Sequence, residues 1–350
     1  MLGFIVRRLF WAVLLVGVMT LITFVMFLMV PKERLSGSTR QGLVTPNLQT
    51  QFDLRGKSLP KQYVLFLDHI VVHGDLGHSL RQPISVREII ARALPVTGSL
   101  VIGGTIVWLL IAFPIGMLSA LRPRSLTDKG LMTFVLIGVS AHPVWIGLML
   151  SYFFGAKLHL FPIAGYCDFF YNGGETPNQC GGAKYWAYYM VLPWITFALL
   201  FAALYARMIR ASMLEVMNED FVRTARAKGA GTWRVLRRHV LPVTLLPVVT
   251  MVGMDVGLAF GGAIFIETVF QLPGMGQELY RALTTTDLPV IMGVVLVVTV
   301  AVTLVNLIVD VLYCFIDPRV RVQGVHAERS PMKVRLRLRP EPQPTESSAT

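Results

Sequence analysis

Charged residues are scarce in this chain of 350 residues, where Asp, Glu, Lys and Arg make up 15% of the sequence. Soluble domains contain about 25% charged residues, and here the low charge accompanies 54% hydrophobic residues and a mean hydropathy of +0.61. The net charge of +12 does not indicate a nucleic-acid partner, because Lys and Arg accumulate in the cytoplasmic loops of membrane proteins. We therefore expect an integral membrane protein and no nucleic-acid binding.

The sequence also lacks the short motifs that carry catalysis. It contains no Gly-x-x-x-x-Gly-Lys-Ser/Thr loop for nucleotide phosphates, no His-Glu-x-x-His zinc motif and no Gly-x-Ser-x-Gly nucleophile turn. We predict that the chain is not an enzyme, and we assign it no catalytic residue, no metal ligand and no cofactor of its own.

Cysteine is rare, with three residues in the whole chain. Cys167 and Cys180 lie in one segment between apolar runs. If that segment is extracytoplasmic, the two thiols could form a disulfide, because disulfides persist in oxidising compartments. Two free thiols are the alternative, which the sequence leaves open.

Long hydrophobic runs dominate what is present. A helix needs about 20 apolar residues to cross a bilayer, and six runs meet this requirement, at about residues 9–30, 94–121, 131–154, 188–208, 241–266 and 289–316. The first run is too long for a signal peptide and has no small-residue cleavage site after it. An even number of spans after the basic pair Arg7 and Arg8 places both termini in the cytoplasm.

These runs divide the chain into four parts. Residues 1–30 form an N-terminal transmembrane helix, and residues 31–93 form an extracytoplasmic insert in which residues 62–72 could be a helix at the membrane surface. Residues 94–316 form a five-helix core that carries a cytoplasmic helix at about 212–235. Residues 317–350 have the composition of a disordered cytoplasmic tail. The fold class is therefore all-α, with six transmembrane helices.

A cationic, amphipathic stretch follows the fourth run, at residues 218–231. Phe221, Ala225 and Gly229 recur every four residues and would share one face of a helix. Arg223 and Arg226 are three residues apart and would share another face. The pattern predicts a short helix outside the membrane, which either rests on lipid headgroups or presents a surface to another protein.

The same stretch resembles a known signature. The string at residues 221–229 (FVRTARAKG), followed by Leu241-Pro242, is similar to the cytoplasmic signature of ABC importer permeases, in the variant of the dipeptide/oligopeptide/nickel family. Residues 7–9, 74–79 (GDLGHS), 267–276 (ETVFQLPGMG) and 306–319 resemble further motifs of that family, in the same order. The resemblance covers about residues 1–321 and is strongest to the first of the two permease subunits of such systems.

The resemblance implies a type I ABC importer permease fold and a role as one half of a translocation pathway for di- or oligopeptides. The implied partners are a homologous second permease, two ATPase subunits or one fused ATPase chain, an extracytoplasmic solute-binding protein and membrane lipid. ATP and Mg would bind to the ATPase subunits. The location would be the bacterial inner membrane. The insert at residues 156–185 could contact the solute-binding protein.

The resemblance also assigns ATPase coupling to the residues of the short helix and the start of the next span, with Phe221 and Val222 as apolar anchors in a groove of the ATPase. The set comprises Phe221, Arg223, Thr224, Ala225, Arg226, Lys228, Gly229, Leu241 and Pro242. A stand-alone secondary transporter or channel is the alternative function, although the chain shows no internal repeat.

The fifth run holds the candidates for lining the pathway, namely Asp255, Gly257 and Gly261. Asp255 departs from the family pattern, which has an uncharged polar residue there, and an acid in hydrocarbon normally faces a cavity or a partner. It could bind the amino terminus of a substrate or contact a neighbouring permease. Glycines at a spacing of four suit close helix packing as well as a smooth pathway wall.

Overall fold

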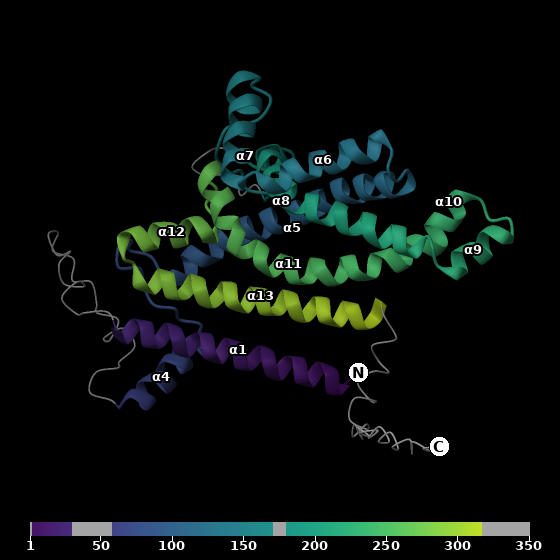
Figure 1. Ribbon diagram of the computed structural model, residues 1–350. Coiled ribbons are helices and arrows are strands. Elements are labelled where there is room, and N and C mark those ends of the chain that lie inside the picture. Colours follow the sequence, from purple (N-terminus) through teal and green to yellow (C-terminus); the bar gives the residue numbers. More distant parts are fainter. Residues whose placement is uncertain (1, 30–57, 171–179, 317–350) are drawn as a thin grey trace, which may run out of the picture.

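The computed structural model of the protein describes residues 2–29, 58–170 and 180–316. Long helices run side by side (Figure 1), and every regular element in these ranges is helical. The elements are α1 (Leu2–Met29), α4 (Leu59–Val71), α5 (Val86–Leu121), α6 (Leu126–Ser140), α7 (Pro143–Leu150), the π-helix η1 (Ser151–Lys157), α8 (Ala183–Val216), α9 (Asp220–Ala227), α10 (Thr232–Val235), the π-helix η2 (Leu236–Val240), α11 (Leu241–Phe270), α12 (Met275–Thr285) and α13 (Leu288–Ile316). The predicted tail at 317–350 and the first half of the predicted insert lie outside the described residues.

Five continuous segments of the described chain are long and apolar enough to cross a membrane. They are Val6–Met26, Val86–Leu121, Ala183–Val216, Thr232–Phe270 and Leu288–Val311. These segments confirm the first, second, fourth, fifth and sixth predicted spans. The helix expected at residues 62–72 is also present, as α4.

The third predicted span, at 131–154, is not one continuous helix. It is a broken pair, Leu126–Gly138 and Pro143–Lys157, bent by 102°. Pro143 explains the break, because proline lacks an N–H group and forces the residue before it out of the helical conformation. His142 accordingly has an extended backbone (φ −68°, ψ 136°). Its ring nitrogen Nδ1 accepts a hydrogen bond from the backbone N–H of Val144 at 3.3 Å and so caps α7.

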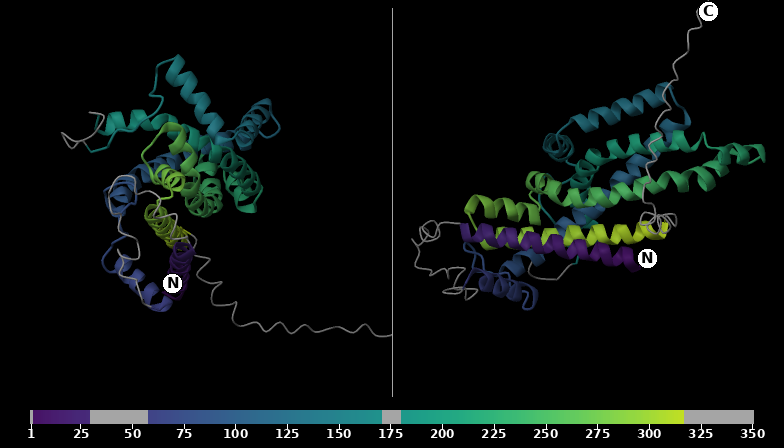
Figure 2. Two further views of the ribbon diagram at one scale, coloured as in Figure 1. Left: turned by 90° about the vertical axis from the view of Figure 1, so that its left-hand side faces the viewer. Right: turned by 60° about the horizontal axis from the view of Figure 1, so that its bottom comes forward.

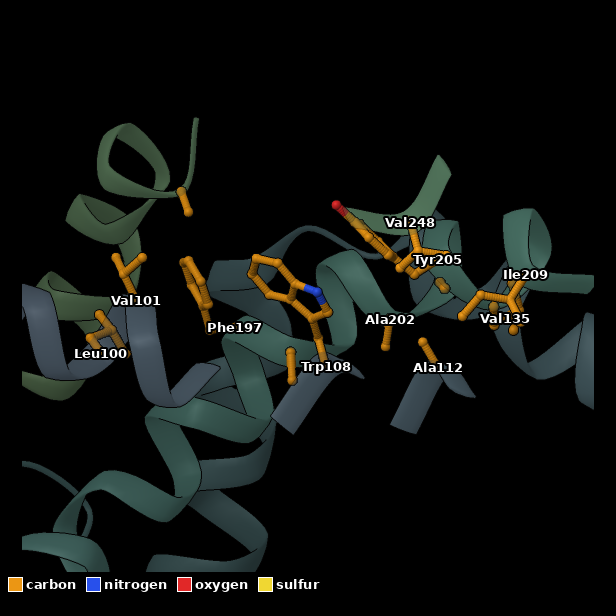
Figure 3. Close-up of a cluster of buried hydrophobic side chains, with 14 of the residues drawn as sticks. Leu100, Val101, Trp108, Ala112, Val135, Phe197, Ala202, Tyr205, Ile209 and Val248 are labelled. Carbon is orange, nitrogen blue, oxygen red and sulfur yellow. The ribbon is translucent and has the colours of Figure 1, made fainter. Parts of the chain in front are cut away.

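The main core is centred between α5 and α8, where aromatic side chains pack among aliphatic ones (Figure 3). Trp108 of α5 is fully buried, and its ring centroid lies 4.5 Å from that of Phe201 and 5.7 Å from that of Tyr205. The two helix backbones approach closely at Gly116, where a Cβ atom would lie 2.8 Å from the carbonyl oxygen of Ala206. Small residues at such crossings are typical of membrane helices, which gain stability from close packing.

Helix α1 lies along α13 at the periphery of the bundle, in both views (Figures 1 and 2). Arg8 of α1 forms an ion pair with Asp310 of α13 at 3.1 Å. A small apolar cluster that includes Phe24, Phe66 and Met292 joins α1, α4 and α13 at the other end. Helix α1 begins and α13 ends at the end of the bundle that carries α9 (Figures 1 and 2).

Candidate functional site

The cationic stretch folds as a separate short helix, α9, at one end of the bundle (Figure 1). Asp220 lies in its first turn and Arg226 in its last turn, and both charges oppose the helix dipole. The helix ends at Ala227, and Gly229, two residues later, has a φ of +80°. A left-handed residue after the last turn is a common helix stop, and glycine adopts that conformation at the lowest cost.

The expected cytoplasmic helix at about 212–235 is therefore not a single element. Helix α8 continues to Val216, a turn separates it from α9, and α10 begins at Thr232 after the second turn. The sequence pattern predicted a short helix within residues 218–231, and α9 lies inside that stretch. The pattern did not show that α8 extends to Val216. Residues 209–216 continue this helix, and Ile209, Met213 and Val216 pack in the main core.

Helix α9 has a buried face and an exposed face. Val222 is fully buried in the main core, and Ala225 packs partly against that core. Phe221, by contrast, is 42% exposed. The remaining candidates on α9 and its end are all exposed, namely Arg223, Thr224, Arg226, Lys228 and Gly229.

This division corrects the expectation that Val222 anchors α9 to another protein. Val222 instead fixes α9 to its own chain, since it is buried in the main apolar core and α9 contacts α10 and η2. Phe221 is the large apolar side chain of α9 that remains exposed. Leu241 and Pro242 belong to the first turn of α11, and α10 and η2 stand between them and Gly229 in the chain.

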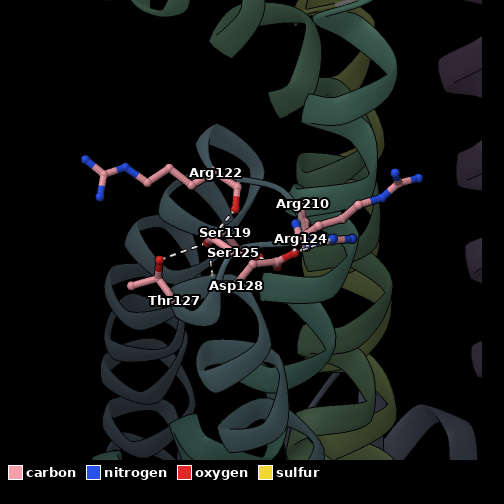
Figure 4. Close-up of polar contacts among 7 residues, drawn as sticks. All are labelled: Ser119, Arg122, Arg124, Ser125, Thr127, Asp128 and Arg210. Carbon is pink, nitrogen blue, oxygen red and sulfur yellow. Dashed lines mark hydrogen bonds and ion pairs between the residues drawn. The ribbon is translucent and has the colours of Figure 1, made fainter.

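A buried ion pair that the sequence did not reveal lies at the same end of the bundle (Figure 4). The guanidinium of Arg210 on α8 donates two hydrogen bonds to the carboxylate of Asp128 on α6, each at 2.8 Å. Asp128 also accepts hydrogen bonds from the Ser119 hydroxyl and from the backbone N–H of Arg124, the latter at 2.9 Å. The pair ties the α5–α6 turn to α8, the helix that leads into α9.

The sequence gives one indication of this pair, which is a single acidic residue within a turn rich in basic residues. Asp128 stands between Arg122, Arg124 and Lys129 and follows the helix cap Ser125. The helix dipole alone would explain an acidic residue at this position, because Asp128 lies in the first turn of α6 and a negative charge stabilises a helix N-terminus. The partner is 82 residues away, and a contact of that separation is decided by packing.

Asp255 lies in the middle of α11 and is half-buried. One of its carboxylate oxygens, Oδ2, accepts a hydrogen bond from the hydroxyl of Tyr205 at 2.7 Å. Tyr205 is fully buried, and Figure 3 shows it next to the aromatic core between α5 and α8. The structure thus gives Asp255 a partner within its own chain and leaves the rest of the carboxylate for other contacts.

The glycines of α11 divide into two kinds. A Cβ atom on Gly257 would lie 3.1 Å from Val302 of α13, and Gly253 abuts Val309 of the same helix. These two glycines allow α11 and α13 to pack closely. At Gly261, by contrast, a Cβ atom would meet nothing within 4 Å in the described structure. Gly261 is therefore the most open of the three candidates, while Gly257 and Asp255 are partly exposed and each also contacts a neighbouring helix.

At the opposite end of the bundle, two buried acids hold the segments that carry the other family-like motifs. Glu267 is fully buried and accepts hydrogen bonds from Thr97 Oγ1 at 2.6 Å and from the backbone N–H of Gln277 at 2.9 Å. Asp287 accepts hydrogen bonds from the Ser79 hydroxyl and from the backbone N–H of Leu80, the latter at 3.1 Å. Both motifs therefore have a structural role in joining α5, α12 and α13.

Cys167 and Cys180 are bonded to each other in the segment between η1 and α8, with their Cα atoms 5.5 Å apart. The bond closes a loop whose residues 171–179 lie outside the described ranges. Gly165 at the start of this segment donates its backbone N–H to the carbonyl of Phe270 at 2.9 Å, which attaches the segment to the end of α11.

Comparisons with known proteins agree with this architecture. The family described as binding-protein-dependent transport system inner membrane component matches residues 112–322, and its N-terminal companion family matches residues 1–101. The dipeptide transport system permease protein DppB of Escherichia coli K12 is 34% identical over 337 residues, which cover 92% of this chain and 99% of that protein. The di/tripeptide transport system permease protein DppB of Pseudomonas aeruginosa is 33% identical over 92% of this chain and 100% of its own length.

A chain of the MetNI methionine ABC transporter, solved in an inward-facing conformation, has a similar fold. The TM-score is 0.53 at 16% identity, over 65% of this chain and 96% of that chain. This similarity confirms the predicted type I ABC importer permease fold. The protein is a multi-pass membrane protein and belongs to the family of binding-protein-dependent transport system inner membrane components.

Proposed function

We propose that this chain is one of two permease subunits in an ATP-driven importer of di- or oligopeptides in a bacterial inner membrane. The peptide substrate is supported by relatives at 33–34% identity that are dipeptide or di/tripeptide permeases over nearly their full length. The alternative of a stand-alone carrier loses its basis, because the family consists of components of larger transport systems.

The observation that carries the proposal is the construction of α9. Val222 fixes one face of this helix to the bundle, while Phe221 and the cationic residues of the other face are exposed in the described structure. A helix that is rigidly attached on one side and exposed on the other can transmit a movement from a bound partner to the spans. The proposed partner is an ATPase subunit with a groove for α9.

The rest of the assembly follows from what the chain itself lacks. Because the sequence holds no phosphate-binding loop, ATP and Mg are assigned to two separate ATPase subunits or one fused ATPase chain. A second, homologous permease would complete the pathway, and an extracytoplasmic solute-binding protein would deliver the peptide. In this arrangement the end of the bundle at which α9 lies, α1 begins and α13 ends (Figure 1) faces the cytoplasm, an orientation that the distribution of Lys and Arg favours.

Purification of the tagged chain in mild detergent tests the proposal. The wild-type chain is expected to retain a second permease and the ATPase subunits. Phe221→Asp should lose the ATPase subunits, because a charge replaces the exposed apolar anchor of α9. The matched control is Leu126→Asp, which places the same charge at a side chain 86% exposed on α6 and should retain them.

Two outcomes would contradict the proposal. One is recovery of the wild-type chain without any ATPase subunit under conditions that keep it folded. The other is equal retention of the ATPase by wild type and Phe221→Asp, which would mean that α9 is not the docking surface.

A further inference from the structure

A basic hollow lies just beyond α9, where α10 passes into the π-helix η2. Its lining consists of Trp233, Arg234, Arg237 and Arg238. Trp233 is 67% exposed, and the three arginines are exposed as well. One tryptophan and three arginines of consecutive helical turns therefore line one open depression of the surface.

The positive charge of this hollow has no acidic counterpart within the described part of the chain. The acidic residues near α9 and α10 form no ion pair there with these three arginines, and Asp220 is paired with Arg223 at 3.6 Å. Three adjacent guanidinium groups repel one another unless an anion lies between them. Arginine binds phosphate through two parallel hydrogen bonds, so a phosphate group is the anion that suits this site.

Apolar surface continues from the hollow along the span. The hollow lies at the start of Thr232–Phe270, a helical segment that is long and apolar enough to cross a membrane. In the first turns of α11, Pro242, Val243 and Pro247 are exposed, and Val243 is 40% exposed. A basic depression at the edge of a span, with an apolar strip beside it, matches the headgroup and the acyl chain of one phospholipid.

The position of Trp233 supports the same occupant. Tryptophan is enriched where the headgroups meet the hydrocarbon, because its ring is apolar and its N–H group is polar. Arginine side chains at the ends of spans extend to the same level. An acidic surface of a soluble protein would satisfy the arginines but would not account for an exposed indole next to exposed prolines and valine.

We propose that Trp233, Arg234, Arg237 and Arg238 form a binding site for the headgroup of an anionic phospholipid, with an acyl chain along Pro242, Val243 and Pro247. The site lies between the docking helix α9 and the span α11. A lipid bound there would hold the start of α11 at a fixed depth in the membrane. This inference does not depend on the nature of the transported substrate.

Native mass spectrometry of the full-length chain tests the site. The chain is titrated in detergent with phosphatidylglycerol or with phosphatidylcholine of the same acyl chains. We expect wild type to retain phosphatidylglycerol in preference to phosphatidylcholine. Each single change, Arg234→Gln, Arg237→Gln or Arg238→Gln, should lower that preference by roughly fivefold, the factor that corresponds to about 1 kcal/mol per basic residue near a membrane surface. The triple variant should show no preference.

The matched control removes three exposed cations from the α5–α6 turn at the same end of the bundle, as Arg122→Gln/Arg124→Gln/Lys129→Gln. This control should retain the lipid preference of wild type. Trp233→Ala should weaken the retention of both lipids, because the indole contributes contact to the chain as well as to the headgroup. Circular dichroism of each variant verifies that the helices are intact, and the single variants decide the question if the triple variant unfolds.

Three results would overturn the proposal. Equal lipid preference in wild type and all three single variants would show that these arginines do not hold the lipid. Displacement of phosphatidylglycerol by inorganic phosphate at equal concentration would show an anion site without lipid character. Loss of the ATPase subunits from the triple variant, with its phosphatidylglycerol preference intact, would assign the hollow to protein docking.

Discussion

Gly229 shows how much of the proposed coupling depends on single residues. Its φ of +80° lets the chain turn directly after α9, and no atom lies within 4 Å of the position of a Cβ in the described structure. The glycine is therefore required by the backbone conformation and not by lack of space. The nearby Gly231 has a φ of −62°, which any residue adopts, so the two glycines differ in this one respect.

Gly229→Val is expected to impair coupling, because a β-branched residue in the left-handed conformation costs about 1–2 kcal/mol and would shift the end of α9. Uptake and substrate-stimulated ATP hydrolysis by the reconstituted importer should both fall, by about tenfold for each 1.4 kcal/mol. Gly231→Ala is the control and should leave both rates near those of wild type. Unchanged rates in Gly229→Val would remove the glycine from the coupling mechanism.

At the residue scale, the sequence predicted most of the exposed surface of α9 but not its attachment. The spacing of Phe221, Ala225 and Gly229 indicated a helix but not its faces, because Gly229 lies beyond the end of α9, and Phe221 is exposed whereas Ala225 packs partly against the core. It could not show that Val222 is buried by other parts of the same chain, because burial depends on neighbours that are distant in sequence. For the same reason, the sequence led us to expect that Phe221 and Val222 would both contact a partner, whereas Val222 is buried within its own chain.

At the scale of elements, the bundle is joined by polar contacts at the ends of its helices. Asp128 and Arg210 join α6 to α8 next to α9, and Glu267 joins α11 to α5 and α12 at the other end. Each acid is nearly or fully buried, so each is costly to leave without its partner. Such contacts make neighbouring helices move together.

Asp128→Asn should destabilise the protein by about 3 kcal/mol, because breaking a buried ion pair leaves the charge of Arg210 uncompensated. The expected result is a clear fall in the unfolding temperature of the purified chain in detergent. Arg92→Gln is the control, since it removes an exposed ion pair with Glu88 and should cost less than about 1 kcal/mol. An equal effect of the two substitutions would show that the Asp128–Arg210 pair does not stabilise the bundle.

The third span shows the limit of sequence at this scale. The proline at 143 predicted a disturbed helix in an apolar run, and the run itself predicted a membrane segment. The bend of 102° was not predictable, because proline determines only that the helix is interrupted. The direction in which the chain continues depends on what α7 packs against, which is α8 and α11.

At the scale of the whole molecule, this chain would form only part of a pathway in the proposed assembly. On α11, Gly253 and Gly257 face α13, while Asp255 bonds to Tyr205 of α8 and Gly261 has open space. The free surface of α11 would face the second permease in the proposed assembly. Asp255 would then place a negative charge beside the pathway, where it could bind the amino terminus of a peptide or contact the second permease.

Asp255→Asn distinguishes these two roles in the reconstituted importer. If Asp255 binds the substrate, uptake of a dipeptide with a free amino terminus should fall about tenfold relative to its N-acetylated form, because a charge-assisted hydrogen bond contributes about 1.5–3 kcal/mol. Tyr205→Phe is the control, since it removes the hydroxyl but keeps the carboxylate. If both substrates are affected equally and the two permeases no longer copurify, Asp255 has the structural role.

The sequence by itself determined the membrane location, the positions of the spans, the short cationic helix and the family, because each depends on composition or on residues close together in the chain. Only the tertiary structure decided which face of α9 is free, that Gly257 is a packing residue, and that Asp128 meets Arg210 across 82 residues. These features depend on which helices lie side by side. Periodicity gives each helix its faces, but only packing decides which partner each face meets.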